Sequence, residues 1–183
     1  QVLGNTSKVG SSSPGNFDLK VGSGGTYLAY SDWEGEPYGS ASIIKYDGSD
    51  WTSIGDSVTS GSAFDLSLDI DSSDNPIISY VEIDSDNLEY KSLVKKYNGS
   101  NWETLMTSTY SYTESYEPHQ FHNDVKVNSS NIPYIAYSDP DYNYEATAKK
   151  WNENSFEIIG NYGFTEDSSD NYIMTLNLEI DNS

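Results

Sequence analysis

Hydrophobic and polar residues alternate along several short stretches of this chain. Residues 66–70 read Leu-Ser-Leu-Asp-Ile, and residues 176–180 read Leu-Asn-Leu-Glu-Ile. Short apolar runs follow polar turns at 77–80 and 134–137, and another short run lies at 93–97. A period of two is typical of half-buried β-strands, and no stretch shows the period of a helix. The pattern therefore predicts an all-β chain made of short strands.

The chain is also internally repetitive, with a period of about 50 residues, which is typical of propellers and helical arrays. Residues 46–51 (Tyr-Asp-Gly-Ser-Asp-Trp) recur at 97–102 (Tyr-Asn-Gly-Ser-Asn-Trp) and more loosely at 151–156. Residues 70–80 match residues 127–137 in the same order. The Asp-Gly and Asn-Gly pairs of the first element are signals for two-residue hairpins. Four short strands to a repeat describe an antiparallel sheet of propeller type.

These motifs resemble the degenerate β-propeller repeats of secreted bacterial proteins. The shared features are an apolar strand, an Asp-Ser-Ser-x-Asn-Pro-like turn, a Tyr-x-Ala-Tyr run and a Tyr-Asn-Gly-Ser-x-Trp hairpin. The resemblance implies a β-propeller built from four-stranded antiparallel blades. A fainter likeness to the Asp-box hairpin of sialidases at 48–51 departs from that motif, because Tyr46 stands where the motif has Asp. A simple hairpin with a Trp packed between blades is the favoured interpretation.

The repeat predicts a single segment over residues 1–183. It contains three blades at roughly 15–55, 64–106 and 121–160, and half-blade ends at 1–5 and 172–183. About three and a half blades cannot close a ring of the usual four to eight. We therefore expect either additional blades from a longer chain or self-association that completes the ring.

The charge and composition narrow the range of partners. Nine Lys+Arg against 29 Asp+Glu give a net charge of −20, and all nine cations are lysines. Nucleic acid and anionic membrane surfaces are therefore not expected partners. A sialidase would require an arginine cluster on the substrate carboxylate, and the chain contains no arginine. Without cysteine there is no disulfide framework, and with 16 Tyr the chain is too aromatic for a disordered coil. This composition favours an extracellular or cell-surface location.

One rim of the predicted blades is acidic and aromatic. It carries the loops between second and third strands and the loops between blades, whereas the opposite rim consists mostly of Ser, Asn, Asp and Gly turns. Sugars offer ring faces to aromatic side chains and hydroxyls to Asp or Asn, and Tyr also suits protein interfaces. Tyr110 and Tyr162 fall on this rim, and Tyr30, Tyr80 and Tyr137 are expected in the core. The candidate ligand-binding residues are Trp33, Tyr38, Tyr112, Tyr116, His119, His122, Tyr142 and Tyr144.

The acidic loops suggest calcium, which prefers several oxygen ligands in a flexible loop. The candidate ligands are Asp139, Asp141, Asn143 and Glu145 in one loop and Asp84, Asp86 and Glu89 in another. Neither loop has the full twelve-residue calcium pattern, so a solvated acidic strand edge is the alternative. His119, His122 and Asp124 could form a metal or acid–base cluster, with structural or surface histidines as the alternative.

These observations favour a non-catalytic extracellular or cell-surface binding module that recognises a glycan or a protein through its acidic, Tyr-rich rim. One alternative is a structural subunit of an extracellular assembly, joined through its incomplete end blades by strand addition. Another is a carbohydrate-active enzyme other than a sialidase, because paired carboxylates can cleave glycosides. Calcium is the only cofactor that the sequence suggests.

Overall fold

The computed structural model describes residues 16–31, 39–59, 61–84, 86–87, 89–111, 121–165 and 175–181. Within them, the strands form three antiparallel sheets of four strands each. The first sheet contains β1 (Phe17–Gly22), β2 (Gly25–Ser31), β3 (Ala41–Tyr46) and β4 (Trp51–Ser53). The second contains β5 (Ser62–Ile70), β6 (Pro76–Asp84), β7 (Glu89–Tyr97) and β8 (Trp102–Ser111). The third contains β9 (Asn123–Val127), β10 (Pro133–Asp139), β11 (Glu145–Trp151) and β12 (Phe156–Ile158), with a 3₁₀ turn, η3 (Pro140–Tyr142), between β10 and β11.

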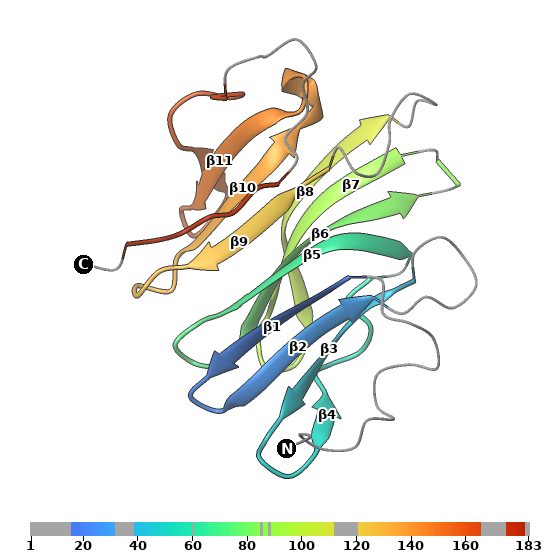
Figure 1. The fold of residues 1–183 in the computed structure, drawn as a ribbon, viewed down its shortest axis with the longest axis vertical. Helices are drawn as coiled ribbons and strands as arrows, with labels where there is room; N and C mark the ends of the chain where they lie inside the picture. The colour runs from blue at the N-terminus through green and yellow to red at the C-terminus, as the bar shows by residue number, and fades with distance from the viewer. Residues whose placement is uncertain are drawn as a thin grey trace.

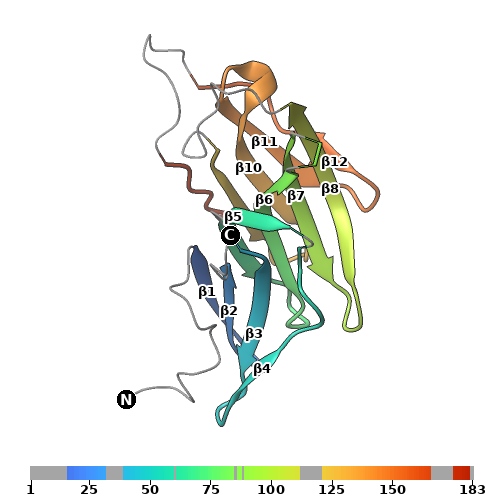
Figure 2. The same cartoon turned by 90° about the vertical axis from the view of Figure 1, so that its right-hand side faces the viewer.

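Each sheet is a meander in which strands that follow one another in sequence are neighbours (Figure 1). The first strands β1, β5 and β9 lie against one another, so the three sheets follow in an arc (Figures 1 and 2). Over the described residues this arc does not close into a ring. The predicted all-β, propeller-type architecture of four-stranded antiparallel blades is therefore confirmed. In this part of the chain, no helix is long and apolar enough to cross a membrane.

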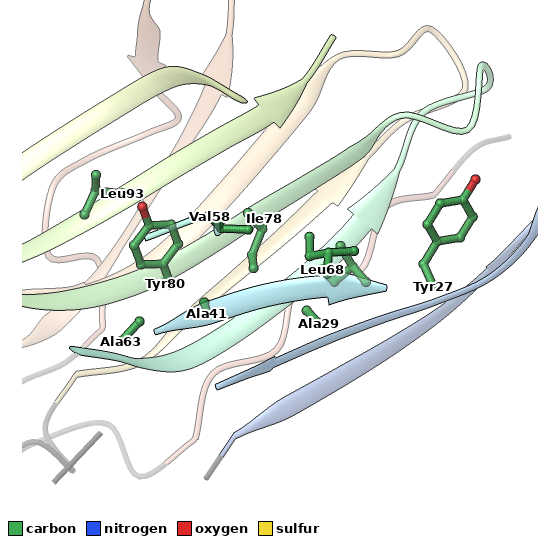
Figure 3. Close-up of a cluster of buried hydrophobic side chains, with 10 residues drawn as sticks. Tyr27, Ala29, Ala41, Val58, Ala63, Leu68, Ile78, Tyr80 and Leu93 are labelled. Carbon is green, nitrogen blue, oxygen red and sulfur yellow. The ribbon is translucent and has the colours of Figure 1, made fainter. Parts of the chain in front are cut away.

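Apolar side chains fill the spaces between neighbouring sheets. Between the first and second sheets, the fully buried rings of Tyr27 and Tyr80 pack with Ala29, Ile43 and Leu68 (Figure 3 shows this cluster). Other clusters fill the space between the second and third sheets, where β5, β6 and β7 face β9 and β10. The expected core positions of Tyr30, Tyr80 and Tyr137 are confirmed, with 8%, 0% and 2% of their surfaces exposed. Strand β6 of the second sheet is buried on both faces, as the six consecutive buried residues at its start show, because a sheet packs on either side of it.

The hairpins between third and fourth strands turn one residue later than the sequence suggests. In the first sheet the backbone N–H of Asp47 donates to the carbonyl of Asp50, so Gly48 and Ser49 form the two-residue loop. Gly48 has a φ of 105°, and the Asp47 carboxylate accepts the backbone N–H groups of Ser49 and Asp50. These bonds hold the pKa of Asp47 at about 2, with the Ser49 hydroxyl as the largest cause. The aspartate therefore caps the turn, and the glycine supplies the positive φ.

The first strands of successive sheets are joined by a repeated hydrogen bond. The backbone N–H of Leu68 in β5 donates to Asp18 Oδ2 in β1 at 2.8 Å. The N–H of Val125 in β9 donates to Ser67 Oγ in β5 at 3.2 Å, and the N–H of Leu178 donates to Asp124 Oδ2 in β9 at 2.7 Å. Segment 175–181 therefore runs beside β9 in the place of the next first strand (Figure 1, dark red). It has no strand pairing among the described residues, and the predicted end at 1–5 lies outside them.

Candidate functional site

The structure describes three of the eight predicted ligand-binding residues. Trp33, Tyr38, Tyr112, Tyr116 and His119 lie outside the described residues. Tyr142 is exposed, whereas His122 is half-buried and Tyr144 is buried. Tyr142 lines a cavity of about 400 Å³ on the predicted acidic and aromatic rim, in the space between the second and third sheets. The residues around this cavity, called the tyrosine pocket below, are Ser108, Tyr110, Tyr137, Asp139, Asp141, Tyr142, Lys149 and Tyr162.

Two exposed tyrosine rings stand together at the tyrosine pocket. Tyr142 ends the η3 turn and Tyr162 lies in the loop after β12. Their rings are stacked, with 4.9 Å between centroids and 7° between planes. The two side chains are 43% and 44% exposed. Both rings are therefore partly open to the solvent, although Lys149 also lies over the Tyr162 ring.

The local sequence explains why these two loops meet. Asp139 caps the η3 turn by accepting the backbone N–H of Asp141 at 3.2 Å, and Asn143 ends the turn at a φ of 55°. In the other loop, the N–H of Gly163 donates to Thr147 Oγ1 at 3.1 Å, and Gly163 has a φ of 52°. A Cβ on Gly163 would lie 2.9 Å from the Cβ of Tyr142. Glycine at this position therefore allows the close approach that stacks the rings.

Among the described residues, one cation, Lys149, lines the tyrosine pocket. The Nζ atom of Lys149 lies 5.2 Å from the ring centroid of Tyr137 and 5.6 Å from that of Tyr162. Both distances suit a cation–π interaction. Burial lowers the pKa of Lys149, while the charges of Asp139 and Asp141 act in the opposite direction. The ammonium of Lys149 is therefore partly stripped of water, and the two nearby carboxylates favour its charged form.

The inner wall of the tyrosine pocket consists of buried phenols. Burial raises the pKa of Tyr137, and the neighbouring Tyr110 and Asp139 raise it further. Burial also raises the pKa of Tyr110, again with a contribution from the charge of Asp139. Both hydroxyls are therefore protonated at neutral pH and can donate as well as accept. With Lys149 and the two aspartates, the pocket offers hydrogen-bond donors and acceptors below an aromatic lip.

The predicted calcium ligands are spread over several elements. Asp139 ends β10 and caps η3, and it pairs in register with Glu145 at the start of β11. In the other loop, the hydrogen bond from Lys91 holds the pKa of Asp84 well below its usual range. Lys91 Nζ lies 2.6 Å from Asp84 and 3.7 Å from Glu89. Asp86, Asp141 and Asn143 are exposed. Over the described ranges, no group of three or more His, Asp or Glu is arranged to hold a metal ion.

His122 and Tyr144 take structural positions. His122 Nδ1 lies 3.8 Å from Asp65 Oδ1, and its backbone N–H donates to Ser138 Oγ. Asp124, the expected partner of His122, instead binds Ser67, Lys126 and the backbone of Leu178. Tyr144, expected on the rim, is 7% exposed and packs edge-on against Phe121. Its φ of 61° follows the positive φ of Asn143, and these two residues turn its ring inward.

Lys149 is one of two pocket residues that the sequence does not mark, and Ser108 is the other. The third strands of all three repeats contain lysine, so nothing in the sequence distinguishes this one. Lys95 and Lys149 hold equivalent positions in the strand register, because Lys95 pairs with Ile78 as Lys149 pairs with Ile135. The contacts of their side chains differ. Each lysine lies over a second-strand tyrosine, Lys95 over Tyr80 at 5.9 Å and Lys149 over Tyr137 at 5.2 Å. Lys95 Nζ also donates to the carbonyl of Val58 at 2.7 Å, whereas Lys149 Nζ also lies over the Tyr162 ring. Lys149 lines a cavity because the loop after β12 brings Tyr162 beside it.

A second cavity, of about 770 Å³, lies between the same two sheets at the other ends of their strands. Leu105, Tyr134 and Trp151 line it, together with the turns after β9 and β11. Two of its acidic side chains are engaged locally: Asn98 Nδ2 donates to Glu103 and Asn152 Nδ2 donates to Glu157, both at 2.5 Å. Lys96, Lys150 and Glu153 also line this cavity.

No family model and no curated protein matches the chain. Solved structures that are similar to it include the following two. One is a fucose lectin from Kordia zhangzhouensis in complex with methyl-fucoside, with 15% identity, a TM-score of 0.48, and coverage of 81% of this chain and 99% of the lectin. The other is a thermostable family-43 glycoside hydrolase, with 12% identity, a TM-score of 0.48, and coverage of 86% of this chain. The chain spans 56% of the length of that hydrolase.

Proposed function

We propose that this chain is a non-catalytic binding module that recognises a neutral glycan through the tyrosine pocket. The observation that carries the proposal is the stacked pair of Tyr142 and Tyr162 directly beside Lys149. A pyranose has flat C–H faces that pack on aromatic rings and a rim of hydroxyls that both donate and accept. Small-molecule sites combine aromatic walls with a few placed polar groups in the same way.

The polar groups of the tyrosine pocket support a neutral sugar over a charged one. The Asp141 carboxylate accepts hydrogen bonds from hydroxyls, and Lys149 donates to them. An acidic polysaccharide would meet the charges of Asp139 and Asp141 and a chain with a net charge of −20, so it would be repelled. We assign the setting as extracellular or the cell surface, where glycans are presented. The protein-binding interpretation of the same rim would use the tyrosines without needing the lysine.

The binding interpretation is favoured over catalysis by the position of Asp139. Glycoside hydrolysis needs two carboxyl groups that both reach the scissile bond. Asp139 is 3% exposed and its carboxylate caps the η3 turn, so its role is to hold Tyr142 in place. Asp141 is exposed at the mouth of the pocket.

A glycan array of neutral oligosaccharides tests the proposal. The chain is expected to bind a subset of them, and Tyr142→Ala and Lys149→Met are each expected to reduce the signal. Tyr46→Ala is a matched control, because Tyr46 forms an aromatic pair with Trp51 in the first sheet, far from the tyrosine pocket. Binding that is confined to anionic glycans, or equal loss in the control, would contradict the proposal.

A further inference from the structure

The strand β1 turns its apolar side chains toward the solvent. Phe17, Leu19 and Val21 are 68%, 50% and 73% exposed, whereas Asp18 and Lys20, between them, are half-buried. Three adjacent apolar residues on one face of a strand form a continuous patch. In a chain this acidic, such a patch marks an interaction surface.

The other two sheets show what covers this face. Leu19 pairs with Leu28, Leu68 with Ile78, and Val125 with Ile135, so Leu19, Leu68 and Val125 hold the same position in β1, β5 and β9. Leu68 and Val125 are both fully buried. Leu68 packs against the first sheet and Val125 against the second. At this position, the cover is therefore the preceding four-stranded sheet.

Within the part of the chain that the structure describes, the backbone of β1 also lacks the hydrogen bond to a preceding first strand that β5 and β9 make. The N–H of Leu68 and the N–H of Val125 each donate to a side chain of the preceding first strand, Asp18 or Ser67. The N–H of Leu19 instead donates to Oδ1 of its own neighbour Asp18, at 2.7 Å. An acceptor from another sheet would replace this exposed local bond.

We propose that this face of β1 binds the third sheet (β9–β12) of a second copy of the chain, in head-to-tail fashion. The third sheet already holds a first strand of the same kind, because Leu178 donates to Asp124 Oδ2 as Leu68 donates to Asp18 Oδ2. The β1 strand of one copy displaces segment 175–181 of the second copy. The N–H of Leu19 in the first copy then donates to Asp124 Oδ2 of the second copy. The interface therefore continues the packing that joins the sheets within one chain.

Two features favour the exchange. Segment 175–181 has no strand partner among the described residues, and its apolar side chains are only half-buried. β1 brings a complete sheet, which covers more of the third sheet than one strand does. β1 also carries Lys20 at the position of Glu179, so a cation replaces an anion in an acidic molecule. The opposing force is the repulsion between two chains of net charge −20, which salt screens.

Sedimentation velocity of the chain over a concentration series, in about 0.05 M and about 0.5 M salt, tests the proposal. We expect concentration-dependent association that is stronger in the higher salt. Leu19→Glu should weaken association at least about tenfold, because it removes a buried leucine and places a charge in the apolar interface. Leu178→Asp should strengthen association, because it loosens the segment that β1 must displace.

The control is Thr109→Glu, which adds the same charge at an exposed position of β8, the outer strand of the second sheet. It should leave association unchanged. Head-to-tail docking also predicts that Leu19→Glu still binds the wild-type chain, by offering its third sheet, whereas pairing of two β1 faces would abolish that complex. A monomer in every condition, including Leu178→Asp, would overturn the proposal, as would association that survives Leu19→Glu. Failure of glycan binding would leave this test unaffected.

Discussion

The rings of Tyr142 and Tyr162 lie parallel, with 4.9 Å between their centroids, although the two residues belong to different loops of the third sheet. The stack is the lip of the tyrosine pocket, and Lys149 lies against the Tyr162 ring at 5.6 Å. The geometry depends on how closely the loop after β12 approaches η3. The residue that permits this approach is Gly163.

Gly163→Ala is therefore expected to separate the two rings. The new Cβ would lie 2.7 Å from Glu145 Oε2 and 2.9 Å from Tyr142 Cβ, at a φ of 52°. Positive φ alone costs an alanine about 1–2 kcal/mol.

Gly160→Ala is the matched control, because Gly160 has a φ of 76° and an alanine Cβ there would have no heavy atom within 4 Å. Urea denaturation should show a larger loss for Gly163→Ala, and near-ultraviolet circular dichroism should change only in that variant. Equal effects in both would contradict a contact-dependent stack.

The hairpin after β11 predicts a stabilising substitution. Glu153 has a φ of 76°, whereas the corresponding hairpins have Gly48 and Gly99, with φ values of 105° and 94°. Because a non-glycine residue is strained there, Glu153→Gly should raise the free energy of unfolding by up to about 1 kcal/mol. Gly99→Ala should lower it by a similar amount, since no atom lies near its Cβ position and only the backbone is affected. Thermal melting of both variants checks the two signs. A destabilised Glu153→Gly would show that its side chain matters more than its backbone.

Acid stability should depend on Asp71. Burial alone would raise the pKa of Asp71, but hydrogen bonds from Asn75 and Lys96 outweigh it and lower the pKa below 3.8. A carboxyl with a lowered folded pKa stabilises the fold above its unfolded pKa, and this contribution is lost as pH falls through the folded value. Asp71→Asn should cost about 1 kcal/mol at pH 7 and progressively less below pH 3.8.

Urea titrations of the wild-type chain and Asp71→Asn between neutral pH and the acid limb measure this difference. The substitution is a mild one, because Asn128 holds the same turn position in the third sheet and accepts the N–H groups of Ser130 and Ile132. A difference that stays constant with pH would show that the Lys96 ion pair is not responsible.

Glycan binding should weaken in alkaline solution through Lys149. Burial lowers the pKa of Lys149 below its ordinary 10.5, so its ammonium loses a proton earlier than an exposed lysine does. If the ammonium donates to sugar hydroxyls, affinity falls as pH rises through this lowered pKa. Lys149→Met should bind more weakly at pH 7 and show no such decline. Parallel pH profiles for the two proteins would exclude a role for the charge.

The sequence predicts the architecture well because the architecture follows from periodicity. Alternation at 66–70 and repetition of the 46–51 hairpin require only that apolar residues face a core every second position. The same periodicity places Tyr80 and Tyr137 in the core, where both are buried. The order of strands is the same in all three described sheets, so the pattern of one repeat predicts the arrangement of the others.

The candidate site is less predictable because it depends on residues that break the period. Asn143 and Tyr144 both have positive φ, which ends the alternation expected from Asp139 onward and buries the Tyr144 ring. The position of Lys149 beside Tyr162 depends on a loop that returns to the sheet after β12. Neither the double left-handed turn nor the returning loop has a signature in the spacing of residues.

In the proposed site, Tyr142 contributes a ring to a bound sugar. Calorimetric titration of the strongest neutral glycan from the array into wild-type chain, Tyr142→Ala and Tyr46→Ala tests it most directly. We predict that Tyr142→Ala weakens binding about tenfold, which is about 1.4 kcal/mol, while Tyr46→Ala binds as the wild-type chain does. Unchanged affinity in Tyr142→Ala, with the fold intact by circular dichroism, would contradict the proposed site.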